Sequence, residues 1–512
     1  MKKQEVFLGE CLLKDSLAEV SADFVEIDNE RYYCIRNYHE MPDFFISVVS
    51  DSDHWMFISS NGSLSAGRKN RDNALFPYYT EDKIHDYKDI TGSKSIFLVE
   101  KNNKTYLWEP FSDQSKSLYS VSRNICKSIY GNKILFEEIN HDLGLSFHYK
   151  WMNSEKYGFI KHSVIKNLNP EKTNIRFLDG IRNILPYGIH YTFQNEYSNL
   201  LDAYKKNEKV EDTSLGLFML SSIPVDKAEP SESLKTTTVW STGLPNSKIL
   251  ISDQHLNDFR LGSLPEEEMD VRASRGAYFV NSDIQLESHG SESWFLVAEI
   301  NQDSSDVVNL IHSLQNDKDL VEKLQEDVDK GTQRLISLVA KADGLQKSQE
   351  ELTSTRHYSN TLFNIMRGGI YQNGYFINIQ DLMDFTRQTN QKIFDKHKEW
   401  FLELGHEIHL NQLHDLVKNE KDPHLIRIIY EYLPLTFSRR HGDPSRPWNV
   451  FSIETRNEDG SEKLNYEGNW RDIFQNWEAL NLAFPEYVEN IISKFLNAST
   501  ADGYNPYRIT RN

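Results

Sequence analysis

Ser293-Trp294-Phe295-Leu296-Val297 and, a few residues later, Ser304-Ser305-Asp306-Val307-Val308 mark the change of pattern that decides the fold. The first run has the aromatic and branched residues typical of a buried strand. In the second, serines that can cap a helix precede valines that begin a helical repeat with Ile311 and Leu314. Strand patterns lie before this stretch and helical patterns after it, so we expect a β-rich part followed by a helical part.

The part before residue 300 consists of many short aromatic or alternating runs. Examples are Phe44-Phe45-Ile46-Ser47-Val48-Val49, Trp55-Met56-Phe57-Ile58 and Leu145-Ser146-Phe147-His148-Tyr149. Turn signals such as Ser60-Asn61-Gly62 and Tyr130-Gly131-Asn132 separate them. Strands at this spacing predict a large antiparallel sandwich or barrel. A part of this length favours two stacked large sheets over one small barrel.

Three amphipathic stretches follow, at 304–314, 320–328 and 335–342, with Lys, Glu, Asp and Gln between their apolar positions. Gly331 and Gly344 break the apolar repeat, which favours a helical linker docked on its neighbours over a functional coiled coil. We therefore predict three parts: a β-domain at 1–300, a helical linker at 301–354 and a helical domain at 355–512. In the last part we expect helices at 379–401, 425–432, 469–482 and 485–496.

Composition excludes several classes of protein. The 512 residues contain 57 Lys and Arg against 76 Asp and Glu, and the formal charge of −19 disfavours broad binding to nucleic acid or to anionic membranes. No run approaches the roughly 20 apolar residues that a membrane span needs, and no leader peptide is recognisable. Three cysteines (Cys11, Cys34 and Cys126) form no CxxC pair and predict no disulfide framework. We expect a cytoplasmic protein.

Common catalytic and metal motifs do not occur. The sequence has no Walker loop, no GxGxxG and no GxSxG elbow. His406-Glu407-Ile408-His409 differs from HExxH because the second histidine comes one residue early. His406 and His409 could share a helix face near His414, but solvated helical histidines are more common than metal ligands, and we predict no metal site.

One candidate site is the loop Ser438-Arg439-Arg440-His441-Gly442-Asp443-Pro444-Ser445-Arg446-Pro447-Trp448-Asn449. Prolines stiffen a loop, arginine forks bind carboxylate or phosphate, and a tryptophan face suits a sugar ring. A structural loop held by Arg–Asp pairs is an equally good interpretation. The predicted substrate-binding residues of this loop are Arg440, His441, Asp443, Arg446 and Trp448.

A second candidate is 466–478. If it is helical, Arg471, Gln475 and Glu478 lie on one face, with Asp472 and Asn476 beside them. Such mixed donors and acceptors suit a hydroxyl-rich ligand. Taken alone, an ordinary first helical turn with Asp472 favouring the helix dipole is the better explanation. A third element, Arg367-Gly368-Gly369-Ile370-Tyr371, predicts tight backbone at a domain junction.

The order of these parts resembles the six-hairpin glycosidase clan, and within it the cellobiose phosphorylase-like proteins. Trp470-Arg471-Asp472 with Gln475 is similar to the Gly-aromatic-Arg-Asp-x-x-Gln-Asp segment of that family. The resemblance implies an N-terminal β-supersandwich and an (α/α)6 barrel. It also implies that Arg471 and Asn476 contact the sugar of the −1 subsite, with Asp472, Gln475 and Trp470 supporting them. Asn469 replaces the family's Gly and Asn476 replaces its sugar-binding Asp.

A complete barrel of twelve helices does not fit in 355–512, where only about five or six helices have room. We therefore expect the front part of a longer inverting glycoside phosphorylase or hydrolase, whose general acid would lie beyond Asn512. The expected partner is an oligosaccharide or glycoside, with inorganic phosphate as a possible co-substrate, no other cofactor and a possible homodimer. The alternatives are a non-catalytic carbohydrate-binding or assembly protein and a purely structural interaction module.

Overall fold

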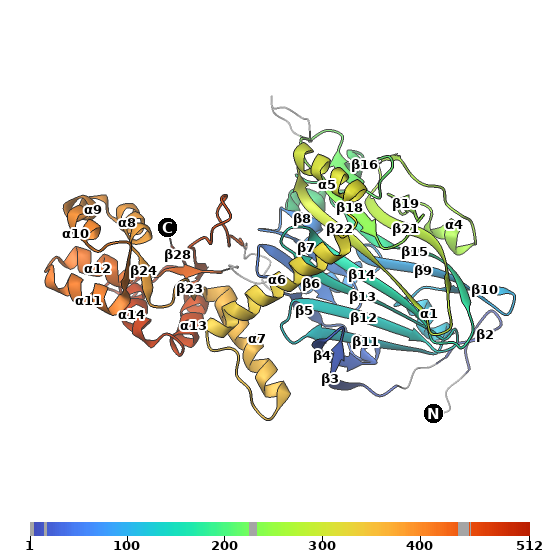
Figure 1. The fold of residues 1–512 in the computed structure, drawn as a ribbon, viewed down its shortest axis with the longest axis horizontal. Coiled ribbons are helices and arrows are strands. Elements are labelled where there is room, and N and C mark those ends of the chain that lie inside the picture. Colours follow the sequence, from blue (N-terminus) through green and yellow to red (C-terminus); the bar gives the residue numbers. More distant parts are fainter. Residues whose placement is uncertain (1–4, 15–17, 225–232, 439–449, 451, 512) are drawn as a thin grey trace. The chain divides into compact units, whose positions relative to one another are not determined.

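The computed structural model describes residues 5–14, 18–224, 233–438, 450 and 452–511 (Figure 1). The chain divides into two compact units, Met1–Thr332 and Gln333–Asn512. A large β-sheet region therefore precedes a helical region. Every pair of named strands is antiparallel.

Three sheets make up most of the first unit. The largest runs, in spatial order, through β20 (Asp270–Arg272), β16 (Lys205–Lys209), β17 (Gly216–Leu220), β18 (Thr236–Thr242), β22 (Ser291–Gln302), β14 (Gly158–Asn167), β13 (Leu145–Ser154), β12 (Lys133–Asn140), β11 (Val121–Ser128), β4 (Glu30–Arg36) and β3 (Ser21–Ile27). The second contains β10 (Lys104–Trp108), β9 (Gly92–Lys101), β15 (Thr173–Ile184), β21 (Gly276–Leu286) and β19 (Lys248–Leu250). The third contains β5 (Phe45–Val48), β6 (His54–Ser59), β7 (Leu64–Arg68) and β8 (Ala74–Phe76).

Short elements complete the unit: β1 (Phe7–Leu8), β2 (Cys11–Leu12), α1 (Asp113–Leu118), α2 (Tyr191–Glu196), α3 (Ser198–Asp202), α4 (Leu256–Arg260) and the 3-10 turns Tyr38–Glu40 and Ile84–Tyr87.

One hydrophobic core joins the three sheets. Alternate residues of the eleven-stranded sheet, such as Phe147, Trp151 and Trp294, meet residues such as Phe177 and Met56 from the two smaller sheets. The sequence favoured two stacked sheets, whereas this core lies among three. The outer face of the eleven-stranded sheet carries a second apolar cluster, which the helices α5 (Ser304–Asn316) and α6 (Leu320–Lys341) cover.

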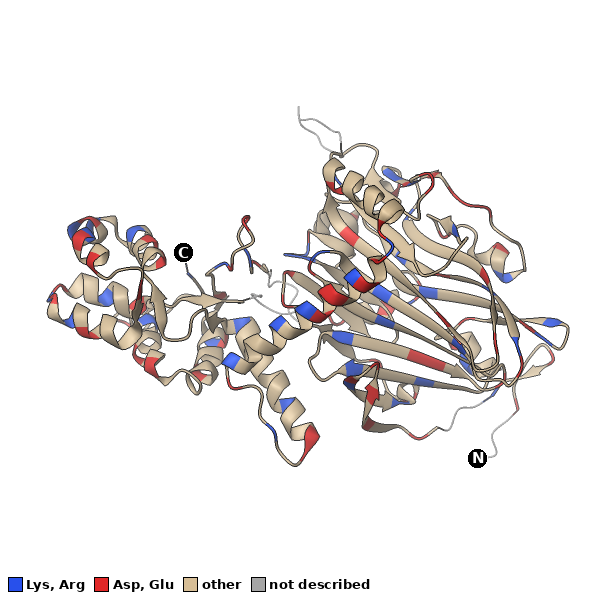
Figure 2. Cartoon of the chain, viewed as in Figure 1, with Lys and Arg blue, Asp and Glu red and all other residues tan. Residues whose placement is uncertain are grey.

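These two helices correct two sequence expectations. Asp303, and not a serine, caps α5: its side chain accepts from the amides of Ser305 and Asp306, and Asp306 bonds back to the Asp303 amide. The stretches predicted separately at 320–328 and 335–342 form the single helix α6, which continues through Gly331. A glycine inside a helix costs only about 1 kcal/mol, and burial of Leu324 and Val328 offsets that cost. Figure 2 shows both signs of charge interspersed along α6.

The cysteine expectation is wrong in part. Cys34 of β4 lies directly opposite Cys126 of β11, with their Cα atoms 4.0 Å apart, and the two form a disulfide. Both side chains are buried on one face of the sheet beside Tyr32 and Leu135. Cys11 is exposed and unpaired among the described residues.

The second unit begins inside α6 and continues with α7 (Glu351–Gly368), β23 (Ile370–Tyr371), β24 (Phe376–Asn378), α8 (Ile379–Thr389), α9 (Gln391–Lys396), α10 (Lys398–Glu403), β25 (Glu407–His409), α11 (Leu410–Asn419), α12 (Pro423–Glu431), β26 (Leu435–Thr436), β27 (Glu467–Asn469), α13 (Trp470–Asn481), the 3-10 turn Pro485–Tyr487, α14 (Val488–Ala498) and β28 (Arg508–Thr510). Three short helices replace the single helix predicted at 379–401. Asn390 causes the first break, because its extended backbone ends α8 while its side chain accepts from the Ile393 amide and caps α9.

No helix within the described residues has the length and apolar character needed to cross a lipid bilayer.

Candidate functional site

The helix predicted around the Trp470-Arg471-Asp472 motif is confirmed as α13. Asn469 precedes it with extended backbone and stands at the N-cap position. Its side-chain amide reaches Asp472 Oδ2 at 3.4 Å. Asp472 lies in the first turn, where a carboxylate favours the helix dipole.

The 3.6-residue repeat divides the predicted residues of α13 into two sets. Arg471 and Gln475 are exposed, and Asp472 is half-buried. Trp470 and Asn476 are only 6% and 8% exposed. The motif therefore has one set of side chains on the open face of the helix and another set packed against its neighbours.

The buried set holds α13 in place. The Trp470 ring lies 4.9 Å from Phe474 and 4.8 Å from Phe495 of α14. Asn476 donates from Nδ2 to Asn364 Oδ1 of α7 at 2.9 Å. With so little of its surface open, Trp470 packs as a core aromatic instead of offering a face to a sugar ring.

The exposed set is available for a ligand. Within the part of the chain that the structure describes, Arg471 makes no hydrogen bond and no ion pair, so its guanidinium keeps all five N–H donors. Gln475, one turn further along the helix, adds an amide donor and an acceptor. Such a pair can bind hydroxyl, carboxylate or phosphate oxygens.

The loop residues Arg440, His441, Asp443, Arg446 and Trp448 lie outside the described residues. The last residue before this loop is placed, however. Ser438 donates its hydroxyl to the carbonyl of Arg367 at the end of α7. Gly368 follows Arg367, and a Cβ atom there would lie 2.9 Å from Cβ of Asn476. The start of the loop and the middle of α13 therefore both meet the last turn of α7.

Tight backbone at this point agrees with the prediction for 367–371. Gly369 has φ of +86°, a region that favours glycine. The Trp477 indole of α13 donates to the carbonyl of Gly368 at 2.7 Å. Close approach of α7 and α13 depends on the absence of a side chain at Gly368.

The histidines do not lie as the sequence suggested. His409 ends β25, a strand, so it shares no helix face with His406. His414 is buried in α11 and stacks on Tyr430 with 4.3 Å between ring centroids, and burial lowers its pKa. No group of three or more His, Cys, Asp or Glu side chains in the described residues is placed to hold a metal ion.

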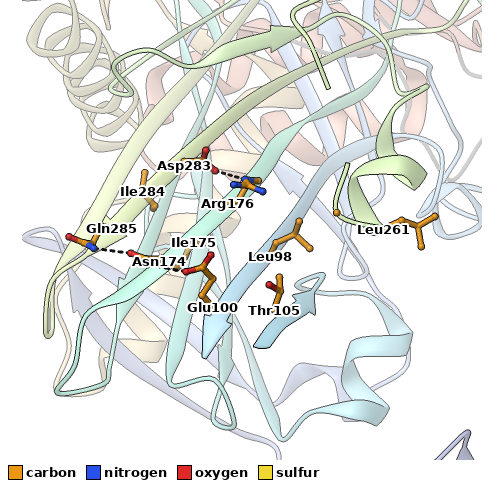
Figure 3. A pocket seen from close by; sticks show the side chains of 11 residues that line it. Leu98, Glu100, Thr105, Asn174, Ile175, Arg176, Leu261, Asp283, Ile284 and Gln285 are labelled. Carbon is orange, nitrogen blue, oxygen red and sulfur yellow. Dashed lines mark hydrogen bonds and ion pairs between the residues drawn. The ribbon is translucent and has the colours of Figure 1, made fainter. Parts of the chain in front are cut away.

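A cavity that the sequence did not predict lies on the outer face of the five-stranded sheet in the first unit (Figure 3). Its volume is about 630 Å³, which is within the usual range for small-ligand sites. Polar side chains line it in two rows: Asn174 donates to Glu100 at 3.0 Å and accepts from Gln285 at 2.9 Å, and Arg176 donates to Asp283 at 2.7 Å.

The exposed Leu261 stands at the edge of this cavity. The sequence carried one signal for it, the polar Asn174 and Arg176 alternating with the core residues Ile175 and Phe177. The pairing of β15 with β9 and β21, which brings the other residues alongside, is not visible in the sequence.

One segment of the second unit matches a known protein-family model. Residues 371–434 match Glycoside hydrolase family 149 insertion domain 1. The match covers β24, α8–α12 and β25. Curated protein sequences give no match.

Solved structures give only distant similarities. A bacterial glucoamylase complexed with acarbose has 10% identity and a TM-score of 0.35, over 78% of this chain and 53% of that one. A putative kojibiose phosphorylase from the human microbiome has 8% identity and a TM-score of 0.26, over 66% and 37%. This chain thus spans about half of the glucoamylase. TM-scores this low carry no argument about function.

The geometry agrees with an inserted segment. β23 pairs with β26, with Ile370 opposite Thr436 and Tyr371 opposite Leu435, so the chain leaves and returns at adjacent points. We call the β23–β26 pair the neck of the segment. The helix before it, α7, and the helix after it, α13, pack against each other through Asn364–Asn476 and Gly368–Trp477.

Proposed function

We propose that this chain is part of an inverting glycoside phosphorylase or hydrolase. In this proposal the first unit is a β-supersandwich, and α7, α13 and α14 belong to an (α/α)6-type barrel into which 371–434 is inserted. The observation that carries the proposal is the match of 371–434 to an insertion domain of a glycoside hydrolase family. The packing of α7 against α13 beside the neck of that insertion supports it.

Inversion requires a carboxylic acid that protonates the leaving oxygen while water or phosphate attacks the opposite face of the sugar ring. We assign none of the described residues to that proton transfer. Arg471 and Gln475 are proposed to bind and orient the sugar, because they are the exposed polar side chains of the motif. Trp470 and Asn476 are proposed to act through position, since they fix α13 against α14 and α7.

The loop residues Arg440, His441, Asp443, Arg446 and Trp448 remain part of this proposal as a rim of the sugar site. Ser438 supports it, because its bond to Arg367 starts the loop beside the α7–α13 contact. An arginine-rich rim suits the phosphate of a phosphorylase as well as an acidic sugar.

The test is turnover of oligosaccharides by the full-length protein, with and without phosphate. Arg471→Ala is expected to lower kcat/KM about 10²–10³-fold, because charge-assisted hydrogen bonds to the transition state are lost. Its melting temperature should stay close to that of the wild type, since the side chain is exposed. Arg427→Ala, which removes an exposed arginine from α12, is the matched control. A large loss of stability with normal turnover would contradict the proposal.

A non-catalytic carbohydrate-binding protein is the second candidate. The cavity of Figure 3 favours it, because Glu100, Asn174 and Arg176 supply mixed donors and acceptors on a rigid sheet. Titration calorimetry with oligosaccharides distinguishes the two. Binding that survives Arg471→Ala but is lost in Asn174→Ala/Arg176→Ala would support this candidate, and the reverse pattern would refute it.

A further inference from the structure

A second and much smaller cavity lies in the first unit, next to an irregularity in the pairing of β15. The pairing of β15 with β21 shifts register between Arg182 and Ile184. Asn183, in the shift, has φ of +61° and is held by a 2.8 Å hydrogen bond from its Nδ2 to Thr91 Oγ1. Bulges of this kind redirect side chains at the end of a strand. Arg182 is the last residue before the shift, where it still pairs with Ala277 of β21 and Gly92 of β9.

Arg182 is a buried cation with few partners. Its exposed fraction is 9%. Among the described residues its one hydrogen bond runs from Nη2 to the carbonyl of Lys88 at 3.4 Å, and Nε has no partner. Burial lowers the pKa of Arg182, while Asp253 and Asp89 oppose that change. A buried guanidinium with unsatisfied donors is costly unless an acceptor meets it.

Three cations line this cavity, because Lys88 and Lys94 stand there with Arg182, and the carboxylate of Asp89 lines it as well. Lys88 is already paired with Asp113 at 2.8 Å and Lys94 with Glu109 at 2.6 Å, but each ammonium has three donors. Arg182 is the cation of this cavity that has no carboxylate within ion-pair distance among the described residues.

The volume limits what can enter. The cavity measures about 30 Å³, and one water-sized site needs roughly 10–15 Å³. Two oxygen atoms therefore fit, which is the number that a guanidinium fork binds in parallel. Tyr149 lines the wall with its hydroxyl group close to Gly62.

We propose that this cavity binds the oxyanion group of a small ligand, with two oxygens accepting from Arg182 and the ammonium groups of Lys88 and Lys94 beside them. The group is a carboxylate or one edge of a phosphate, and the rest of a larger ligand stays outside. This site is separate from α13 and does not rest on the proposed glycosidase function.

The experiment measures thermal unfolding of the full chain in sodium acetate, phosphate or chloride at equal ionic strength. A bound oxyanion should raise Tm saturably, by roughly 2–4 °C at about ten times Kd. Arg182→Met should abolish the rise. Arg272→Met, which removes an exposed arginine paired with Asp270 and lining neither cavity, should keep it. Acetate acting more strongly than phosphate assigns a carboxylate ligand, and the reverse assigns a phosphate.

Lys88→Met and Lys94→Gln keep the test decisive if Arg182→Met does not fold, since each should weaken the effect several-fold. Equal Tm in all three salts would overturn the proposal and assign the cavity to water. A rise that persists in Arg182→Met would overturn it as well. Oligosaccharide binding should be unchanged in Arg182→Met, so failure of this site and failure of the proposed function are distinguishable.

Discussion

Asp179 offers a sharp test of how the two large sheets are joined. Its carboxylate is fully buried and accepts from Lys161 Nζ at 2.6 and 2.7 Å, Ser95 Oγ at 2.6 Å, Ser163 Oγ at 2.9 Å and Trp294 Nε1 at 2.7 Å. Lys161, Ser163 and Trp294 belong to the eleven-stranded sheet, and Asp179 and Ser95 to the five-stranded sheet. The carboxylate is therefore one of the polar links between the two sheets, beside those of Trp108 to Glu138 and Tyr278 to Ser241.

Asp179→Asn keeps the shape of the side chain but leaves the fully buried ammonium of Lys161 without its counter-ion. Removing one partner of a buried ion pair costs about 3–5 kcal/mol. The surface pair Arg176–Asp283, on the same sheet, gives the matched control, because its side chains are 37% and 66% exposed. Asp283→Asn should cost about 0–1 kcal/mol.

The assay is urea unfolding followed by peptide-resolved hydrogen exchange, so that the transition of Met1–Thr332 is separated from that of the second unit. The double variant Lys161→Met/Asp179→Leu should regain most of the stability lost in Asp179→Asn, since an apolar pair leaves no uncompensated charge. A loss below about 1 kcal/mol in Asp179→Asn, or a double variant less stable than the single one, would refute the reasoning.

Three further predictions concern other parts of the chain. Burial lowers the pKa of His162, which stacks on Phe295, to about 3. The unfolded chain takes up a proton at this side chain near pH 6.5 and the folded chain does not, so His162 by itself should lower the free energy of unfolding by about 2 kcal/mol at pH 5. Burial also lowers the pKa of His39 and His148, so His162→Phe should shrink, and not abolish, the loss of stability between urea titrations at pH 7 and pH 5. The Cys34–Cys126 disulfide spans 92 residues and should add up to about 4–5 kcal/mol to the free energy of unfolding. A thiol reductant should therefore lower the urea midpoint of the wild type but not that of Cys34→Ala/Cys126→Ala. An equal response of the two proteins to the reductant would count against the disulfide. Trp477→Ala empties a fully buried site between α13 and α7 and should cost about 3–5 kcal/mol, with faster hydrogen exchange in α7; unchanged exchange there would contradict the packing.

Local patterns in the sequence predicted much of the fold because they depend on neighbouring residues. Strands and the helices α12, α13 and α14 follow from periodicity and from caps within a few residues. The disulfide did not follow, because Cys34 and Cys126 meet only through the register of β4 against β11. Continuity of α6 through Gly331 depends on packing against the sheet, which local propensity does not contain.

In the candidate site, too, some features follow from the local sequence and others depend on tertiary contacts. That Arg471 and Gln475 share one face of a helix follows from the 3.6-residue repeat alone. That Trp470 is closed off by Phe495, and that Asn476 bonds to Asn364, depends on tertiary contacts between distant helices. The proposed insertion of 371–434 rests on the pairing of β23 with β26 and on the family match, neither of which local sequence patterns contain.

The most direct test of the central claim is titration calorimetry of the chain with a panel of β-glucosides and oligosaccharides, comparing the wild type with Arg471→Ala and Arg427→Ala. The account predicts binding of at least one oligosaccharide by the wild type and by Arg427→Ala. It also predicts at least tenfold weaker binding by Arg471→Ala at unchanged Tm, equivalent to about 1.4 kcal/mol or more. No binding of any sugar, or equal affinity in all three proteins, would contradict it.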